Sequence, residues 1–580
     1  MNHPSALLRA PAPDRDGPGR SSPLPLVAVC LGYFMVILDV TVVTVALPVI
    51  GARMHAGVTG LQWVVDGYTL VFAALLLFCG GLGDRLGGKS VFLGGLVVFT
   101  LASAGCALAP TTAVLVLARL VQGLGAALTV PSSLALLRTA YPGRAARARA
   151  FGVWGTVAGL AAGAGPVLGG VLVAGLGWRS VFFLNLPVGL AALLLTVRHV
   201  PRPPADRSRP GLDLPAQLAA AVCLGGPTTG CIEAGALGPA HPAVLGGFAA
   251  GAAGLMAFLV LERRSPAPML PLTLFRNTAF AASAVIGVLL NAGFYGLLFL
   301  APLYFQQLHH YSALRTGCAL LPAVGVVAAG SALAGRLTAR TGPRLPMVVG
   351  LVVGAAGLAG WLAAGPGTPY PVLVAPMAAA GFGTALTMPA ATAAVKEAAP
   401  GGRSGAAAAV FNAARQTGSA LGVALFGTLV AGGLVTGLHT SVVIGAAGFL
   451  VAAALAARRI PGINRRERVG SEVGTEDRPV HGGGSSVAGA RGEEKPMTLP
   501  WREDESWRRR YPQPGPDWTQ GMPQGRTEPL TPMGRIDQYG RMGSALRGGY
   551  VAPWQRKVIL GFALGAVVVT AVALLLAFFG

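Results

Sequence analysis

Two ionisable residues stand inside long apolar stretches of the sequence, where an unpaired charge is costly. Asp39 lies in the run LDVTVVTVALP, and Arg119 lies in LVLARLVQGLGAA. In a membrane segment such residues are normally paired, turned toward a cavity, or involved in proton transfer. Burial favours the neutral form of a carboxyl and a neighbouring cation favours the ionised form, so a carboxyl between these effects can exchange a proton for a cationic substrate. Asp39 is therefore predicted to bind a proton, and bracing of neighbouring helices is the structural alternative.

Arg119 is expected to tune that carboxyl. A guanidinium does not deprotonate in proteins, so it can act as a fixed positive charge beside Asp39. On a helix, Gln122 lies on the same face as Arg119. The structural alternative for Arg119 is a side chain that braces helices or reaches the membrane surface.

A second polar face is predicted near residue 415. In NAARQTGSALG, the side chains of Asn412, Arg415, Gln416 and Ser419 share one face of a helix. They can line a substrate cavity, or they can hold helices together by hydrogen bonds. Further polar residues in apolar segments are Asp66, Asn185 and Glu233. The residues predicted to line the cavity are Gln122, Tyr68, Asn291, Asn412, Arg415 and Gln416.

Small residues follow a regular spacing in GTVAGLAAGAGPVLGG. Gly155, Gly159 and Gly163 recur every four residues, which allows two helices to approach closely. Pro166 removes one backbone hydrogen bond and permits a bend. The residues predicted to serve this packing are Gly159, Gly163, Gly165, Pro166, Gly169 and Gly170.

Motifs typical of enzymes and nucleotide-driven pumps are missing from the sequence. It contains no G-x-x-x-x-G-K-[ST] motif, no His and Cys spacing typical of metal ligands, and no set of nucleophile, base and acid. The six cysteines lie in or beside apolar segments and are interpreted as small apolar side chains. We expect no enzyme activity, no cofactor and no metal, which leaves an ion gradient as the energy source.

The segments that hold these residues are too apolar for an ordinary soluble protein. Of the 580 residues, 53% are hydrophobic and 11% are charged, and the mean hydropathy is +0.62. Soluble domains are about 25% charged, so the predicted solvent is lipid. The net charge of +22 would suit nucleic acid, but the basic residues lie between apolar runs instead of on one surface. No nucleic-acid partner is expected.

The apolar runs predict fourteen membrane helices, because a spanning helix needs about 20 mostly apolar residues. A fifteenth candidate covers residues 558–579. The fourteen predicted spans are residues 26–48, 62–83, 91–109, 113–137, 150–174, 180–197, 213–235, 242–261, 279–304, 316–337, 346–364, 371–393, 408–432 and 439–457.

Basic residues are concentrated in alternate loops. Eighteen Lys and Arg residues lie in the even-numbered loops, whereas the odd-numbered loops hold Arg53, Arg179 and Arg315. Cytoplasmic loops carry the excess of basic residues. The N-terminus is therefore expected in the cytoplasm.

An internal repeat predicts two related halves. GGLGDRLGGK at residues 80–89 is echoed by GRLTARTGPR at residues 335–344, eight helices later. Two six-helix halves separated by two extra helices explain this distance, and transporters commonly hold their substrate between such halves. The expected parts are a cytoplasmic tail (1–25), a six-helix bundle (26–200), two linker helices (201–265), a second six-helix bundle (266–457), a disordered cytoplasmic tail (458–553) and one more membrane helix (554–580).

The tail contains a pattern of its own. Gly492, Glu493 and Glu494 require a purine-rich codon run that resembles a bacterial ribosome-binding site, and Met497 follows it. Our hypothesis is that residues 497–580 descend from, or still are, a separate small reading frame fused to the rest. A gene-model artefact is the alternative.

Taken together, these motifs resemble the fourteen-helix drug/proton antiporter branch of the major facilitator superfamily, over residues 26–457. LDVTVVTVALP is similar to its first-helix motif, with Thr44 where Asn is usual. LVLARLVQGLGAA is similar to motif B, and GTVAGLAAGAGPVLGG to motif C, with Ala161 at a usual Gly. The resemblance places Arg119 in the region of proton transfer and favours export over uptake.

The loop at residues 80–89 resembles motif A, with Gly88 in place of a usual basic residue. The resemblance implies a latch between helix ends that favours one access state. Signalling of topology by the basic residues is the alternative, and Ala339 takes the Asp position in the second copy. The residues assigned to the latch are Gly80, Asp84, Arg85, Gly87 and Lys89.

The resemblance implies an all-helical integral membrane protein with the major facilitator fold in a bacterial cell membrane. Its expected activity is multidrug or antibiotic efflux, in which lipophilic and often cationic molecules are exported in exchange for protons by alternating access. Export of an endogenous metabolite or a self-made antibiotic is an alternative, and a membrane sensor or scaffold without transport is another. The expected partners are a small molecule, protons and the bilayer, with no nucleotide; the sequence predicts no oligomeric state.

Overall fold

In the computed structural model, residues 23–202, 213–265, 268, 270, 272–399 and 404–462 are described, and they belong to one compact unit. Every regular element in these ranges is a helix. Residues 1–22 of the expected N-terminal tail (1–25) and residues 463–553 of the expected C-terminal tail (458–553) lie outside the described residues, as do the helix at 554–580 and the hypothesis about Met497. The described ends of both tails are partly helical, because α1 begins at Leu24 and α17 ends at Arg459.

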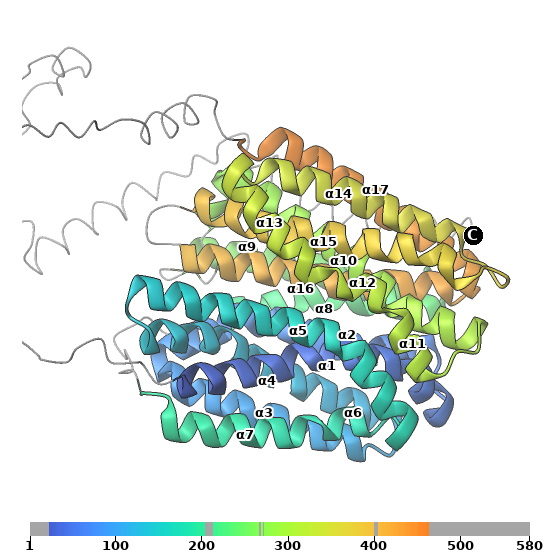
Figure 1. The fold of residues 1–580 in the computed structure, drawn as a ribbon, viewed down its shortest axis with the longest axis horizontal. Coiled ribbons are helices and arrows are strands. Elements are labelled where there is room, and N and C mark those ends of the chain that lie inside the picture. Colours follow the sequence, from blue (N-terminus) through green and yellow to red (C-terminus); the bar gives the residue numbers. More distant parts are fainter. Residues whose placement is uncertain are drawn as a thin grey trace, which may run out of the picture. The chain divides into compact units, whose positions relative to one another are not determined.

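The N-terminal half comprises seven helices, numbered α1 to α7 (Figure 1). They are α1 (Leu24–Met54), α2 (Val58–Leu86), α3 (Gly88–Leu108), α4 (Thr112–Ala140), α5 (Arg144–Leu176), α6 (Ser180–Phe183) and α7 (Asn185–His199). Two further helices, α8 (Leu214–Leu237) and α9 (Pro242–Arg264), follow before the C-terminal half.

The C-terminal half runs from residue 272 to residue 459. Its elements are η1 (Leu272–Arg276), α10 (Thr278–Leu303), η2 (Tyr304–Leu308), α11 (Ala313–Ala319), α12 (Leu321–Gly325), α13 (Val327–Thr341), α14 (Arg344–Gly360), η3 (Trp361–Ala363), α15 (Tyr370–Ala398), α16 (Ser404–Val430) and α17 (Leu434–Arg459).

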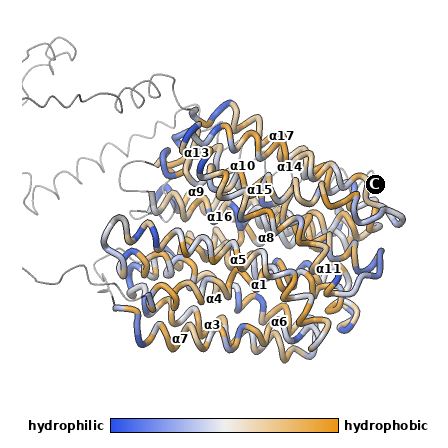
Figure 2. The backbone as a smooth tube through the Cα atoms, viewed as in Figure 1, coloured by the Kyte–Doolittle hydropathy of each residue, from blue (hydrophilic) through white to orange (hydrophobic). Residues whose placement is uncertain are grey.

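Helices cover most of each of the fourteen predicted spans. Hydrophobic residues run along their length, and hydrophilic residues gather toward their ends (Figure 2). α1 has 31 residues, which at about 1.5 Å per residue exceeds the roughly 30 Å of a bilayer's hydrocarbon core. In the described part of the chain, twelve spans are both long and apolar enough to cross a membrane, and α8 and α16 are not among them. This measure therefore does not confirm the count of fourteen.

Two predicted helices are divided in the structure. The tenth predicted span consists of α11, α12 and α13, with interruptions at Leu320 and Val326. Pro322 follows the first interruption and has no N–H to continue the helical hydrogen bonds. The sixth span is interrupted at Leu184, between α6 and α7.

Packing within each half is extensive, and the halves also contact one another. In the N-terminal half, α4 packs on α2 and α3, and α1 packs on α5 and α7; in the C-terminal half, α10 packs on α16 and α17, and α14 packs on α15. The halves meet through α5 with α11, α2 with α16, and α1 with α10. α8 packs on both α2 and α16, so one of the two extra helices bridges the halves.

The repeated loop has the same backbone turn in both copies. Gly87 follows α2 with φ 89°, and Gly342 follows α13 with φ 76°. These glycines occupy equivalent positions in the two motifs, and a positive φ favours glycine because other residues clash there. The repeat thus marks one local structure that occurs in both halves.

Candidate functional site

Asp39 and Arg119 form a buried ion pair in the N-terminal half. Arg119 on α4 donates a hydrogen bond from a terminal guanidinium nitrogen to Oδ2 of Asp39 on α1. Only 2% of Asp39 and 1% of Arg119 is exposed. Since removal of either partner would leave a buried charge uncompensated, the pair is expected to be important for stability as well as for function.

Two amides complete the surroundings of the Asp39 carboxylate. Its Oδ1 accepts hydrogen bonds from Gln122 Nε2 and Asn185 Nδ2, each at 2.9 Å. The same two amide nitrogens reach Oγ of Ser103 on α3, at 2.8 Å and 3.3 Å. Both carboxylate oxygens thus accept hydrogen bonds, which is the arrangement of an ionised carboxylate.

Arg119 is also held by groups other than Asp39. Its Nε donates to the carbonyl oxygen of Val64 at 2.8 Å, and a terminal nitrogen donates to Gln122 Oε1 at 2.7 Å. The guanidinium carbon lies 4.3 Å from the centre of the Tyr68 ring, a cation–π contact. These contacts would keep the guanidinium in place if Asp39 took up a proton.

The structure therefore brings together Asp39, Arg119, Gln122 and Tyr68 from the sequence prediction. It adds Ser103, which the sequence analysis did not select, and gives Asn185 a definite contact. We call these six residues the Asp39 cluster.

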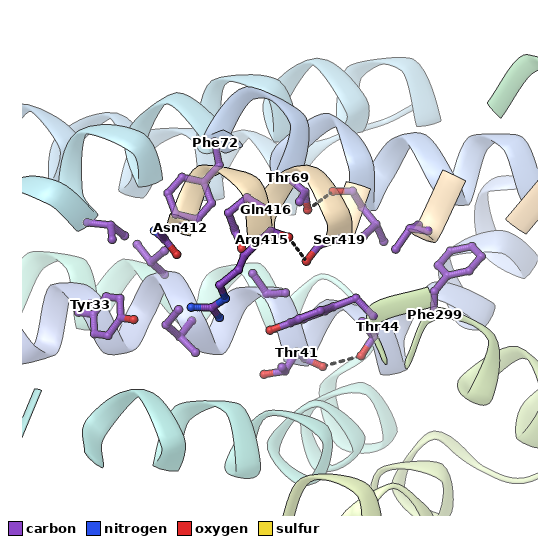
Figure 3. Close-up of a pocket in the computed structure, with 17 residues that line it drawn as sticks. Tyr33, Thr41, Thr44, Thr69, Phe72, Phe299, Asn412, Arg415, Gln416 and Ser419 are labelled. Atoms are coloured by element: carbon purple, nitrogen blue, oxygen red, sulfur yellow. Dashed lines mark hydrogen bonds between the residues drawn. The ribbon is translucent and has the colours of Figure 1, made fainter. Parts of the chain in front are cut away.

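A cavity of about 80 Å³ lies beside the cluster and between the two halves. It is lined by residues of α1, α2, α4, α10 and α16, and Figure 3 shows Asn412, Arg415, Gln416 and Ser419 of α16 facing Thr41 and Thr44 of α1. Sites for drug-sized ligands are usually about 300–1,000 Å³. The cavity must therefore widen to accept a molecule of that size.

α1 separates the cavity from the Asp39 cluster. Ile37, Thr41 and Thr44 line the cavity, and at 100° per residue they lie on the side of the helix roughly opposite Asp39. One helix therefore contacts both the ion pair and the cavity.

The residues predicted to line a cavity divide into two groups. Asn412, Arg415 and Gln416 line it, whereas Gln122 and Tyr68 belong to the Asp39 cluster. Asn291 on α10 is fully buried and donates to the Gly287 carbonyl of its own helix at 2.8 Å. It does not line this cavity, and its predicted role there is untested.

The glycine motif of α5 has two contact faces. A Cβ atom at Gly165 would overlap Thr41 of α1, and one at Gly169 would lie 2.8 Å from the Val42 carbonyl oxygen. On the other face, a Cβ at Gly170 would lie 2.8 Å from Ala313 O of α11, and Pro166 O lies against Gly317. α5 thus packs closely on both α1 and the C-terminal half.

The first part of α5 is packed differently. A Cβ atom at Gly155 or Gly159 would meet no atom within 4 Å, and one at Gly163 would first meet Val324 O at 3.9 Å. α5 therefore packs closely on the C-terminal half near its own C-terminal end, and Gly155 and Gly159 nearer its N-terminal end have no such contact.

Lys89 attaches the loop assigned to a latch to the end of α7. Lys89 Nζ donates to the carbonyl oxygens of Val197 and Val200 at 2.9 Å and 2.7 Å, at the end of α7. A cation suits a helix C-terminus. Asp84 is exposed, and Arg85 is half-buried. A Cβ atom at Gly80 would meet Pro131 of α4 at 3.8 Å, so this position is not tightly packed.

The surroundings of Asp66 on α2 contrast with those of Asp39 on α1. Asp66 is fully buried, and neither of its side-chain oxygens has a hydrogen-bond partner. One turn earlier, Trp63 Nε1 donates to Glu233 Oε1 of α8 at 3.0 Å, and Gln62 Nε2 donates to Ala424 O of α16 at 2.6 Å. Asp66 thus lies in a contact between α2, α8 and α16, without a compensating cation like that of Asp39.

Among the described residues, no group of three or more His, Cys, Asp or Glu side chains is placed to hold a metal ion. The side chains that the structure gathers are instead an ion pair, amides, hydroxyls and one further guanidinium. A carboxylate can take up a proton, and amides, hydroxyls and guanidinium groups can form hydrogen bonds with organic molecules.

A family model described as Major Facilitator Superfamily matches residues 29–423, which include the Asp39 cluster and the cavity. The chain belongs to this superfamily. This confirms the family expected from the motifs, and with it an all-helical membrane transporter fold.

Two relatives are named for antibiotic resistance. The methylenomycin A resistance protein of Bacillus subtilis (strain 168) is 36% identical over 406 residues, which cover 70% of this chain and 87% of the relative. The tetracenomycin C resistance and export protein of Streptomyces glaucescens is 35% identical over 434 residues, which cover 74% of this chain and 79% of the relative. The chain therefore has superfamily relatives named for drug resistance and export.

A solved structure supports the fold. The crystal structure of the nucleoside transporter NupG matches with a TM-score of 0.55 and 14% identity, and the match covers 75% of this chain and 98% of that structure. At this identity the match concerns the fold alone.

Proposed function

We propose that the protein is a proton-coupled exporter of lipophilic drugs or antibiotics that works by alternating access, with its N-terminus in the cytoplasm. The observation that carries the proposal is the position of α1. It holds Asp39 against Arg119 on one side and lines the cavity between the halves with Ile37, Thr41 and Thr44 on the other.

A proton on Asp39 would change the contacts of α1. The protonated carboxyl carries no charge, so it would lose its ion pair with Arg119, while Arg119 would keep its contacts to Val64, Gln122 and Tyr68. Because the same helix packs closely on α5 through Thr41 and Gly165, movement of α1 would reach the contact between α5 and α11. This is the proposed link between proton binding and access.

The cycle follows from these contacts. Asp39 takes up a proton from outside as substrate leaves, and releases that proton inside, where the ion pair with Arg119 forms again. With the N-terminus in the cytoplasm, the C-terminal end of α5, which packs on α11, faces outside. An ionised Asp39 with the outer end closed then corresponds to the state that accepts substrate from the cytoplasm.

The expected cationic substrate has less support from the cavity. Of the 17 residues that line it, none is Asp or Glu, and Arg415 carries the one formal charge. The names of the relatives support export of antibiotics as a class. These names do not specify the charge of the exported molecule.

Proton release from inside-out vesicles with an acidic lumen tests the proposal. A panel of cationic, neutral and anionic drugs is added, and a pH-sensitive dye reports protons that leave the lumen. The wild type should release protons with at least one drug, and the Asp39→Asn variant should not. Asp213→Asn is the matched control, because Asp213 caps α8 and Asn is also a good cap. Equal proton release by the wild type and Asp39→Asn would contradict the proposal.

A further inference from the structure

Arg415 is the one formally charged residue among those that line the cavity. It extends from α16 into the space between α16 and α1, where Figure 3 shows it between Gln416 on its own helix and Tyr33 and Thr41 on α1. A guanidinium does not deprotonate, so this cavity carries a permanent positive charge.

No carboxylate in the cavity lining compensates that charge. Arg415 Nε is buried and has no hydrogen-bond partner. Asp39 lies on the opposite side of α1 and is paired with Arg119, and the buried Asp66 of α2 does not line the cavity. Buried charges in membrane proteins are normally paired or exposed to a water-filled cavity, so an arginine that lines a cavity with no carboxylate in its lining suits a ligand that brings its own negative charge.

The rest of the lining suits an organic molecule with an apolar body. Val36, Ile37, Val65, Phe72 and Phe299 provide apolar surface. Tyr33 and Tyr295 line the same cavity as Arg415 and carry hydroxyl groups. Hydroxyl groups can donate to the oxygens of a carboxylate that the guanidinium binds through two parallel hydrogen bonds.

We propose that the substrates of this exporter carry a carboxylate or a comparably acidic group, which Arg415 binds in the cavity. This inference rests on the proposed function and replaces the expected cationic substrate by an anionic one. Apolar side chains on α1, α2 and α10 hold the body of the molecule, and the two tyrosines complete the contacts of the acidic group.

The charge of the substrate has a consequence for energetics. Export of an anion in exchange for one incoming proton moves two charges across the membrane in the direction that an inside-negative potential favours. Export of a cation in exchange for one proton moves no net charge. Anionic substrates would therefore be driven by the membrane potential as well as by the pH gradient.

Two xanthene dyes of similar shape and opposite charge provide the test: fluorescein is anionic, and rhodamine 123 is cationic. Binding of each dye to the purified full-length protein is measured by fluorescence polarisation at neutral pH. We expect the wild type to bind fluorescein at least about tenfold more tightly than rhodamine 123, since a charge-assisted contact contributes this much or more. Equal affinities, tighter binding of rhodamine 123, or no binding of fluorescein would overturn the inference.

Two variants at Arg415 sharpen the test. Arg415→Met should weaken fluorescein binding about tenfold or more and leave rhodamine 123 binding unchanged or stronger. Arg415→Lys keeps the charge but loses the planar fork, so its fluorescein affinity should lie between those of Arg415→Met and the wild type. Equal loss of both dyes in a variant whose thermal unfolding matches the wild type would also overturn the inference.

The test separates this inference from the proposed function. Dye binding needs no proton gradient, and the comparison of the two dyes in the wild type needs no variant. A preference for fluorescein together with no proton release would support the anionic site and contradict proton coupling. Proton release driven by rhodamine 123 and not by fluorescein would support proton coupling and contradict the anionic site.

Discussion

Arg119 and Arg415 are both arginines in the membrane-spanning part of the molecule, but their surroundings are opposite. Arg119 is 1% exposed and has an ion pair, two further hydrogen bonds and an aromatic ring as partners. Arg415 lines a cavity, and its Nε has no partner. In the proposed mechanism this difference gives one residue type two functions: the paired guanidinium holds the carboxylate that takes up a proton, and the guanidinium in the cavity binds the substrate.

Removal of Arg119 should have the largest effect on stability. Arg119→Met leaves the buried Asp39 carboxylate without its cation, so we expect the free energy of unfolding to fall by about 3–5 kcal/mol. Chemical or thermal unfolding of the purified protein in detergent measures this. The double variant Asp39→Asn with Arg119→Met should recover part of the loss, because the uncompensated charge is gone. No difference between the single and the double variant would contradict the pairing.

Substitution of Asn185, in the same cluster, should lower the stability less than substitution of Arg119. Asn185→Ala removes one hydrogen bond to the Asp39 carboxylate and should lower the free energy of unfolding by about 1.5–3 kcal/mol. Asn291→Ala is the matched control, because the Asn291 side chain donates to a carbonyl of its own helix. An equal or larger loss in the control would show that the hydrogen bonds to Asp39 contribute no special stability.

The contact of α1 with α5 can be changed without touching either arginine. Gly165→Ala places a methyl group against Thr41 and should destabilise the protein by about 1–3 kcal/mol. Gly159→Ala meets no atom within 4 Å and should stabilise it by about 0.4–1 kcal/mol, because alanine has less conformational freedom in the unfolded chain. Thermal unfolding of both variants tests these two expectations. If both substitutions changed the stability in the same direction, the described packing would be contradicted.

Arg415 should show the smallest effect on stability. Arg415→Met leaves no carboxylate unpaired, so the free energy of unfolding should change by less than about 1 kcal/mol in either direction. The same unfolding measurement as for Arg119→Met makes the comparison direct. A loss as large as that of Arg119→Met would mean that Arg415 has a structural partner and is not reserved for a ligand.

Much of the fold followed from local features of the sequence. Apolar runs located the helices, because length and hydropathy are properties of each segment alone. The equivalence of Gly87 and Gly342 followed from the repeated motif, since the turn after a helix constrains a single residue. The divisions at Leu320 and Leu184 were missed because an interruption of one or two residues leaves the hydropathy of a span unchanged.

The site was predictable where a charge stood in an apolar run. Asp39 and Arg119 were found in this way, and the structure pairs them. Ser103 was missed because a serine in a membrane helix usually bonds its own backbone, and the direction it faces depends on how α3 is rotated against its neighbours. For the same reason the sequence could not separate Gln122, which reaches Asp39, from Gln416, which lines the cavity.

The central claim is that the proton and the substrate bind at different charges on opposite sides of α1. Fluorescein binding and substrate-driven proton release, measured side by side in Asp39→Asn and Arg415→Met, test it most directly. We expect Asp39→Asn to lose proton release and keep its fluorescein affinity within about threefold, a change of less than 1 kcal/mol, while Arg415→Met loses fluorescein binding. If Asp39→Asn weakens fluorescein binding as much as Arg415→Met does, the two sites are not separate and the claim is wrong.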